Sequence, residues 1–324
     1  MPLYQMVRWH ANYNEATADL ARPVTEHRVF ECVRPLEHPL VALTIRHKTT
    51  YRYNRPISLN AHRLMLRPRE SRELRLLSAR LTVMPDAFVT WAYDVFGNAV
   101  STVTFQRPTD YLTVDSVTDL ELDAIAWPVF DVAASAAAYP FSYLPDDRAD
   151  LGELAIQQYP DPMGRLRLWS EAFVRSRPTD TLSLLKDLSG GITAWVRYQS
   201  REDEGTQAPV ETLDRGWGSC RDFAVLFVEA ARGLGFGARI VSGYLYNPGR
   251  EAESSTTHAW AEVFVPGAGW ITFDPTNRSV GGFNLIPVAV GRGIHQVMPV
   301  VGSFNGAADA FQGLWVDVSV TAVR

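Results

Sequence analysis

The first sustained pattern in the chain is a two-residue alternation of side chains that begins near Leu43. In the segment LTIRHKTTYRY, residues 43–53, Leu43, Ile45, Tyr51 and Tyr53 fall at alternate positions, with arginine, lysine and threonine among the residues between them. Successive side chains of a β-strand point to opposite faces, so this period is typical of a strand. We expect a strand with one face in water.

Short runs rich in valine, threonine and aromatic residues continue to about residue 120. Turn-forming residues such as Gly97 and Asn98 separate two of these runs. We therefore predict an antiparallel β domain over residues 43–120. Residues 1–42 carry no sustained period, and we interpret them as an N-terminal extension to which the pattern assigns no function.

Charge changes sharply around the end of this domain. Residues 119–161 contain nine acidic residues and one arginine, and we interpret residues 121–163 as an acidic linker or wrapping segment. The stretch Arg63–Arg80 contains six arginines and two glutamates. We interpret it as a strand face in solvent or a dock for the acidic segment. Nucleic-acid binding is the less favoured alternative, because no recognition motif accompanies the arginines.

Beyond residue 164 the period changes from two to between three and four. In residues 181–200 the recurring apolar side chains are Leu182, Leu185, Leu188, Ile192 and Trp195. This spacing predicts a helix, with the glycines at 190 and 191 as a weak point where it could kink. We expect residues 164–324 to form a second domain, which makes the chain an α+β protein.

A cysteine stands at the predicted start of another helix. Ser219 is suited to cap the helix, Cys220 falls in its first turn, and glycines at 233 and 235 mark its end. Unpaired backbone amides and the positive end of the helix dipole favour a thiolate at such a position. The alternative is that Cys220 is a small buried apolar residue.

A predicted hairpin follows in the segment THAWAEVFVPGAGWITFDPTN. His258 shares a strand face with Trp260, and Asp274 shares one with Thr272. In a hairpin the residue numbers of the two members of each cross-strand pair add up to a constant. If that sum is even, His258 and Asp274 lie on one face of the hairpin. An odd total would place them on opposite faces.

A thiol, an imidazole and a carboxylate together can form an activated nucleophile. The imidazole carries the proton, and the carboxylate fixes its tautomer. Each residue also has an ordinary structural alternative, such as a turn-capping role for Asp274. A zinc site is disfavoured because no fourth ligand is evident. We expect neither a metal nor a cofactor.

Several segments resemble the bacterial transglutaminase-like proteins, often described as candidate cysteine proteases. They are GWGSCRDFAVLF, LGFGARIVSGYL, THAWAEVFVPGAGWITFDPTN and PVAVGRG. Two others, HKTTYRYNRPISLNAHRLMLRPRE and YDVFGN, resemble the β region that commonly precedes that core. The resemblance covers about residues 43–318. Members often carry a histidine just before the valine-rich stretch, where this chain has Leu285 or Ile286.

The resemblance implies a papain-like core in which the helix bearing the cysteine packs on an antiparallel sheet. It also implies Cys220 as nucleophile, His258 as general base and acid, and Asp274 as the residue that orients the imidazole. The substrate would be an amide of a peptide, a protein or an isopeptide. We expect hydrolysis through a thioester, with acyl transfer to an amine or a silent binding scaffold as alternatives.

Other residues near the nucleophile each have a functional and a structural interpretation. The backbone N–H of Cys220 is the natural first donor to an oxyanion. Trp217 could supply an indole N–H or simply pack, and Tyr244 could line the cleft or be a core tyrosine. Asp222 is either structural or substrate-facing.

Composition bounds these interpretations. The chain has 324 residues, 46% hydrophobic and 21% charged, with a net charge of −5, so no chain-wide electrostatic attraction to nucleic acid is expected. The start carries no apolar stretch typical of a signal peptide, and no run is long enough for a membrane span. Two cysteines, Cys32 and Cys220, suit a reducing compartment. We expect a cytoplasmic location and no membrane partner, while the oligomeric state stays open.

Overall fold

The computed structural model describes residues 40–125, 128–201, 205–248, 257–307 and 309–323. Residues 1–39, which make up most of the expected N-terminal extension and include Cys32, lie outside the described residues. No helix among the described residues is both long and apolar enough to cross a membrane.

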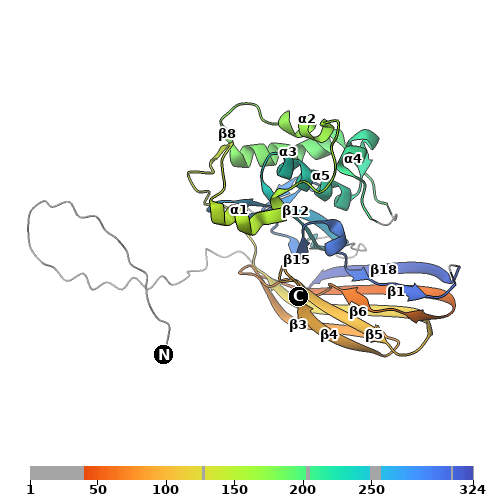
Figure 1. Ribbon diagram of the computed structural model, residues 1–324. Coiled ribbons are helices and arrows are strands. Elements are labelled where there is room, and N and C mark those ends of the chain that lie inside the picture. Colours follow the sequence, from red (N-terminus) through yellow and green to blue (C-terminus); the bar gives the residue numbers. More distant parts are fainter. Residues whose placement is uncertain (1–39, 126–127, 202–204, 249–256, 308, 324) are drawn as a thin grey trace, which may run out of the picture. The chain divides into compact units, whose positions relative to one another are not determined.

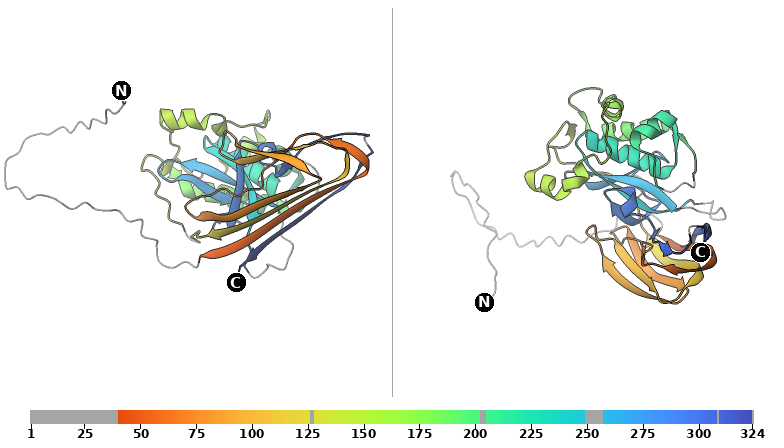
Figure 2. Two further views of the ribbon diagram at one scale, coloured as in Figure 1. Left: turned by 90° about the horizontal axis from the view of Figure 1, so that it is seen from below. Right: turned by 45° about the vertical axis from the view of Figure 1, so that its right-hand side comes forward.

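The β domain consists of two antiparallel sheets. Its first strands are β1 (Val41–Leu59), β2 (His62–Leu64), β3 (Leu74–Met84), β4 (Ala87–Tyr93), β5 (Ala99–Phe105) and β6 (Thr109–Leu122). In β1 the expected alternation is confirmed, because Leu43, Ile45 and His47 are buried while Arg46 is exposed. The long strands β1 and β6 run side by side over most of their length (Figure 2).

The chain returns to this domain at its C-terminal end. Strands β16 (Val300–Val301), β17 (Phe304–Asn305) and β18 (Phe311–Ala322) pair with β2 or β1. β18 follows β1 from Leu43↔Ala322 to Tyr53↔Phe311 (Figure 1). The expectation that the second domain extends to residue 324 is therefore wrong for these strands. A long central strand needs partners on both edges, and only the folded chain shows which segment supplies the second one.

The second domain is built on a five-stranded antiparallel sheet. Its order is β14 (Ser279–Val280), β13 (Gly269–Asp274), β12 (Thr257–Val265), β11 (Gly237–Leu245) and β15 (Leu285–Gly291). Helix α5 (Cys220–Gly233) packs on β11 and β12. The fold is therefore α+β, as expected.

Three further helices accompany α5 on the same side of the sheet (Figure 1). They are α2 (Arg165–Glu171), α3 (Thr181–Trp195) and α4 (Pro209–Arg215). Two short strand pairs complete the domain: β9 (Arg197–Tyr198) with β10 (Trp217–Gly218), in parallel, and β7 (Ala138–Tyr139) with β8 (Thr179–Asp180). The remaining helices are α1 (Pro145–Leu151), η1 (Gly152–Ala155) and η2 (Ile294–Gln296).

Helix α3 is continuous through its two glycines. A Cβ atom at Gly191 would lie 2.2 Å from Cζ of Phe173, whereas a Cβ at Gly190 would meet no atom within 4 Å. Gly191 therefore permits the close approach of an aromatic ring. The two glycines, predicted as a point where the helix could kink, therefore do not interrupt it, and Gly191 packs against Phe173.

The acidic segment wraps around the second domain. The hydroxyl of Tyr143 donates to the carbonyl of Phe264 at 2.7 Å and accepts from the backbone N–H of Gly237 at 2.9 Å. The hydroxyl of Thr181 donates to the carbonyl of Ala136 at 2.6 Å. These bonds hold the segment against β11, β12 and α3.

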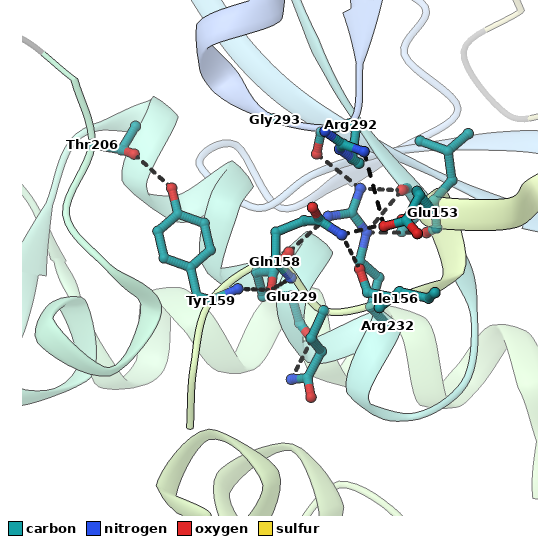
Figure 3. A network of polar contacts seen from close by, with 12 residues as sticks. Glu153, Ile156, Gln158, Tyr159, Thr206, Glu229, Arg232, Arg292 and Gly293 are labelled. Atoms are coloured by element: carbon teal, nitrogen blue, oxygen red, sulfur yellow. Dashed lines mark hydrogen bonds and ion pairs between the residues drawn. The ribbon is translucent and has the colours of Figure 1, made fainter. Parts of the chain in front are cut away.

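The helix that begins with Cys220 contains a buried ion pair whose two side chains also bind backbone groups at the end of this segment (Figure 3). Arg232 Nη1 lies 2.7 Å from Oε1 of Glu229, and the two side chains are 1% and 2% exposed. The other carboxylate oxygen accepts from the backbone N–H groups of Gln158 and Tyr159, at 2.7 and 3.1 Å. The helix and the wrapping segment thus share one hydrogen-bond network.

The arginine-rich stretch has more than one role. Arg75 pairs with Glu121 at 3.4 Å, in line with docking onto the acidic segment. Arg63 donates to the backbone carbonyl of His295 at 3.3 Å in an exposed position. The expectation is wrong for Arg69, whose guanidinium group donates to the backbone carbonyl of Phe96 at 3.1 Å in a partly buried position. A guanidinium group has five N–H donors, so it can tie loops together without a carboxylate partner.

The two domains contact each other through buried polar groups. The side chain of Asn98 donates to the carbonyl of Val290 at 2.7 Å and accepts from its N–H at 2.9 Å. The backbone N–H of Arg69 donates to the carbonyl of Pro287 at 2.8 Å. The turn before β5 is thereby joined to β15 of the core sheet.

Candidate active site

The carboxylate of Asp222 caps the start of α5 by binding Ser219, the residue before the nucleophile. The carboxylate of Asp222 accepts from the backbone N–H of Ser219 at 2.8 Å and from its hydroxyl at 2.7 Å. It also accepts from Arg201 Nε at 3.0 Å and from the backbone N–H of Gln207 at 2.8 Å. Asp222 is fully buried and is therefore structural, which fixes Cys220 in the first helical turn.

The hairpin of β12 and β13 has the even register that brings the histidine and the aspartate to one face. Ala261 pairs with Phe273 and Glu262 with Thr272. Nε2 of His258 lies 2.8 Å from Oδ2 of Asp274, and both side chains are buried. The prediction that these two residues share a face is confirmed.

The thiol joins this pair through the imidazole. The imidazole of His258 is close enough to the thiol of Cys220 to lower its pKa, and the backbone of Ala259 acts in the same direction. Because Nε2 is bonded to Asp274, Nδ1 is the nitrogen left for the sulfur. The structure thus brings the three predicted residues together in the order sulfur, imidazole, carboxylate.

Electrostatics in the site favour the charged forms of all three groups. Burial alone raises the pKa of Cys220, but the hydrogen bond and positive charge of His258 lower it below its usual value. Burial alone lowers the pKa of His258, but Asp274 and Cys220 raise it well above its usual value. Burial likewise raises the pKa of Asp274, which His258 and Asn277 together hold below its usual range. These shifts all favour a thiolate beside an imidazolium over a neutral thiol and imidazole.

Two family profiles match the chain. The bacterial transglutaminase-like N-terminal region matches residues 43–121, and the transglutaminase-like superfamily matches residues 169–275. An uncharacterised protein of Mycobacterium tuberculosis is 30% identical over 301 residues, which cover 86% of this chain and 91% of that protein. This chain belongs to the transglutaminase-like superfamily.

Two further proteins are similar to this chain over most of its length. An uncharacterised protein of Mycobacterium leprae is 25% identical over 273 residues, covering 82% of this transglutaminase-like chain and 93% of the relative. A crystal structure from Cytophaga hutchinsonii, described as a candidate cysteine protease, superposes with a TM-score of 0.70 at 19% identity. It covers 89% of this chain and 92% of that one, so the two share a fold.

One residue of the transglutaminase-like site was missed at the sequence level. The side chain of Asn277 donates to Oδ2 of Asp274 at 2.7 Å. The backbone N–H groups of Thr276 and Asn277 donate to Oδ1 at 3.0 and 3.3 Å. Asn277 therefore positions the carboxylate that holds the imidazole. The sequence could have indicated this role, because Asp274 ends a predicted strand and is followed by Pro-Thr-Asn, a sequence suited to an Asx turn.

Of the two alternatives for Tyr244, the core tyrosine is confirmed, and the lining of the cleft is wrong. Tyr244 is 2% exposed, and its hydroxyl lies 2.9 Å from Nδ1 of His47 on β1. Its neighbour Gly243 lies opposite His258, and successive strand side chains point to opposite faces. Tyr244 therefore contacts the β domain of this transglutaminase-like protein and faces away from the thiol.

Two expectations about the site are left, namely the role of Trp217 and the presence or absence of a metal-binding group. Trp217 lies in β10, three residues before Cys220, and is partly buried with the guanidinium of Arg215 5.4 Å from its ring centre. Its indole role stays a prediction. The described residues hold no group of three or more His, Cys, Asp or Glu side chains placed to bind a metal ion.

Proposed function

We propose that this transglutaminase-like protein is a cysteine-dependent amide hydrolase in which Cys220 is the nucleophile. The observation that carries the proposal is the 2.8 Å bond between His258 and Asp274, with the thiol of Cys220 close enough to the imidazole for each group to shift the pKa of the other. Such an arrangement supplies a nucleophile, a proton carrier and a group that holds the imidazole. Membership of the transglutaminase-like superfamily supports a cysteine-dependent enzyme.

In the first step the thiolate attacks the carbonyl carbon of the amide and forms a carbon–sulfur bond. The carbon–nitrogen bond of the tetrahedral intermediate then breaks. Nδ1 of the His258 imidazolium gives its proton to the departing amine, which leaves as a neutral molecule. The products of this step are a free amine and a thioester on Cys220.

In the second step water attacks the thioester. His258, now neutral, takes a proton from the water, and the carbon–sulfur bond breaks to release the acid and the thiolate. Asp274 stays ionised throughout and stabilises the imidazolium each time it forms. The resting ion pair is thereby restored.

The developing oxyanion needs preorganised donors. Backbone N–H groups in the first turn of a helix have no acceptor within the helix, so the N–H of Cys220 is suited to this role. The indole N–H of Trp217 is our candidate for a second donor, because β10 leads directly to the nucleophile.

Transfer of the acyl group to an amine is the alternative chemistry. Both reactions share the thioester and differ only in the second nucleophile. We favour water because a small core preceded by this β region resembles candidate proteases more than dedicated cross-linking enzymes. A peptide, protein or isopeptide amide is the expected acyl donor. A silent binding scaffold is disfavoured, since the thiol, imidazole and carboxylate are all present.

Thiol labelling and a product screen test the proposal. Iodoacetamide near neutral pH should label Cys220 rapidly, whereas Cys220→Ala should lose that label. Peptide and isopeptide libraries should then be incubated in H2(18)O with and without ethylamine, and the products measured by mass spectrometry. Incorporation of (18)O supports hydrolysis, and an ethylamide product would support transfer. A slow, ordinary thiol at Cys220 would refute a catalytic role.

A further inference from the structure

A solvent-open cavity of about 490 Å³ lies beside the proposed catalytic residues. That volume falls within the range of about 300–1,000 Å³ that is typical of ligand pockets. Its lining includes Thr193, Trp195, Arg197, Tyr198, Thr276 and Arg278. These residues come from the end of α3, from β9 and from the turn after β13.

The cavity is connected to the catalytic residues on two sides. Thr276 donates its backbone N–H to Asp274, and the ring of Tyr198 contacts Phe223 of α5 edge-on, with centroids 6.1 Å apart. Tyr198 also pairs with Gly218, two residues before the nucleophile. Cys220 itself does not line the cavity, so a ligand there would lie alongside the reacting amide.

Two arginines give the cavity a positive charge. No carboxylate lines it, and among the described residues neither Arg197 nor Arg278 forms an ion pair. Arg175 is exposed as well, but it differs from these two arginines because it pairs with Asp187 at 3.1 Å. Coulomb attraction and charge-assisted hydrogen bonds favour an anionic group next to two guanidinium groups that have no carboxylate partner in the described part of the chain.

Arg278 is held in an uncommon backbone conformation at this position. Its φ is +54°, the left-handed region that bulky residues rarely adopt. Its Nε donates to the hydroxyl of Thr193, which in turn donates to the carbonyl of Gly190 at 3.1 Å. A strained and anchored residue at a cavity edge indicates a functional constraint, because strain persists where the surroundings enforce it.

Aromatic rings form the other part of the wall. Trp195 and Tyr198 are 67% and 51% exposed, although large aromatic side chains usually lie mostly buried. Their rings offer apolar contact to the carbon atoms of a ligand, while the arginines offer donors to its charged end. The lining therefore suits a ligand that is part apolar and part anionic.

We infer that this cavity binds a carboxylate of the substrate, next to the amide that Cys220 attacks. The carboxylate is either an acidic side chain or a free terminal carboxylate of a peptide, and the two guanidinium groups of Arg197 and Arg278 recognise either form. The inference rests on the proposed function and adds its substrate class: amides in peptides that carry a negative charge near the cleaved bond.

Binding to the full-length Cys220→Ala variant tests the inference without turnover. Three coumarin-labelled tripeptides serve as probes: Ala-Glu-Ala amide, Ala-Gln-Ala amide and Ala-Gln-Ala with a free carboxylate. We expect at least one carboxylate probe to bind about tenfold or more tightly than the neutral amide, by fluorescence anisotropy. Which carboxylate probe binds identifies its source. The advantage should shrink in added salt, as charge attraction is screened.

Variants in the same background locate the binding. Arg197→Gln and Arg278→Gly should each remove most of the advantage, and glycine keeps the left-handed backbone at position 278. Arg175→Gln, an exposed and paired arginine outside the cavity, should leave it unchanged. Equal binding of all three probes, or an equal loss in Arg175→Gln, would overturn the inference.

The inference and the proposed function can fail separately. Iodoacetamide labelling that is present in the parent protein and lost in Cys220→Ala reports on Cys220 and does not depend on carboxylate binding. A reactive Cys220 with no carboxylate preference refutes only the substrate class. A carboxylate preference with an unreactive Cys220 refutes the hydrolase and leaves a carboxylate-binding protein.

Discussion

The buried ion pair of Arg232 with Glu229 provides a sharp test of how the catalytic helix is held. Arg232→Ala removes the guanidinium and leaves the carboxylate of Glu229 in a site where its side chain is only 2% exposed. The same change removes donors to the backbone carbonyls of Leu154, Ala238 and Arg292, at 3.0, 2.8 and 2.8 Å. Loss of one partner from a buried pair costs about 3–5 kcal/mol.

Urea unfolding followed by tryptophan fluorescence measures this cost. The matched control is Arg167→Ala, whose partner Glu171 lies 3.2 Å away with both side chains well exposed. Pairs of that kind contribute about 0.3–0.5 kcal/mol. A protein of this kind has only about 5–15 kcal/mol of stability, so Arg232→Ala should move the unfolding midpoint far more than the control.

A double variant separates charge from packing. Arg232→Met with Glu229→Gln keeps similar volume and an acceptor oxygen for the backbone N–H groups of Gln158 and Tyr159. It should be more stable than Arg232→Ala, because no uncompensated charge stays buried. If Arg232→Ala costs no more than Arg167→Ala, the reasoning from burial is wrong.

Three further predictions concern the catalytic residues and α3. His258→Ala should shift the inflection of the iodoacetamide rate at Cys220 to higher pH, because burial without the imidazolium raises the thiol pKa; an unchanged pH profile would contradict the ion pair. Asn277→Ala should shift the same inflection upward by a smaller amount, with urea unfolding as the control for stability. Gly190→Ala should stabilise the protein by about 0.5–1 kcal/mol. Gly191→Ala should destabilise it, since the new Cβ meets an aromatic ring; equal signs in thermal unfolding would refute this difference.

The sequence by itself determined the features that depend on local periodicity. The alternation from Leu43, the capped start of the helix at Ser219 and the placement of His258 and Asp274 on the two strands of one hairpin all follow from how neighbouring residues project. Each needs only a few adjacent positions, so each was readable before folding. The identity of the three candidate catalytic residues belongs to this group.

Only the tertiary structure decided features that join distant segments. The return of β18 to β1 and the contact of Tyr244 with His47 link residues roughly 200 or more positions apart. The cavity arginines, Arg197 and Arg278, likewise come from separate elements. No local pattern records such partners, because strand pairing and side-chain burial depend on which surfaces meet after folding. The chemistry of the nucleophile was therefore legible in the sequence, whereas the surroundings that would select its substrate were not.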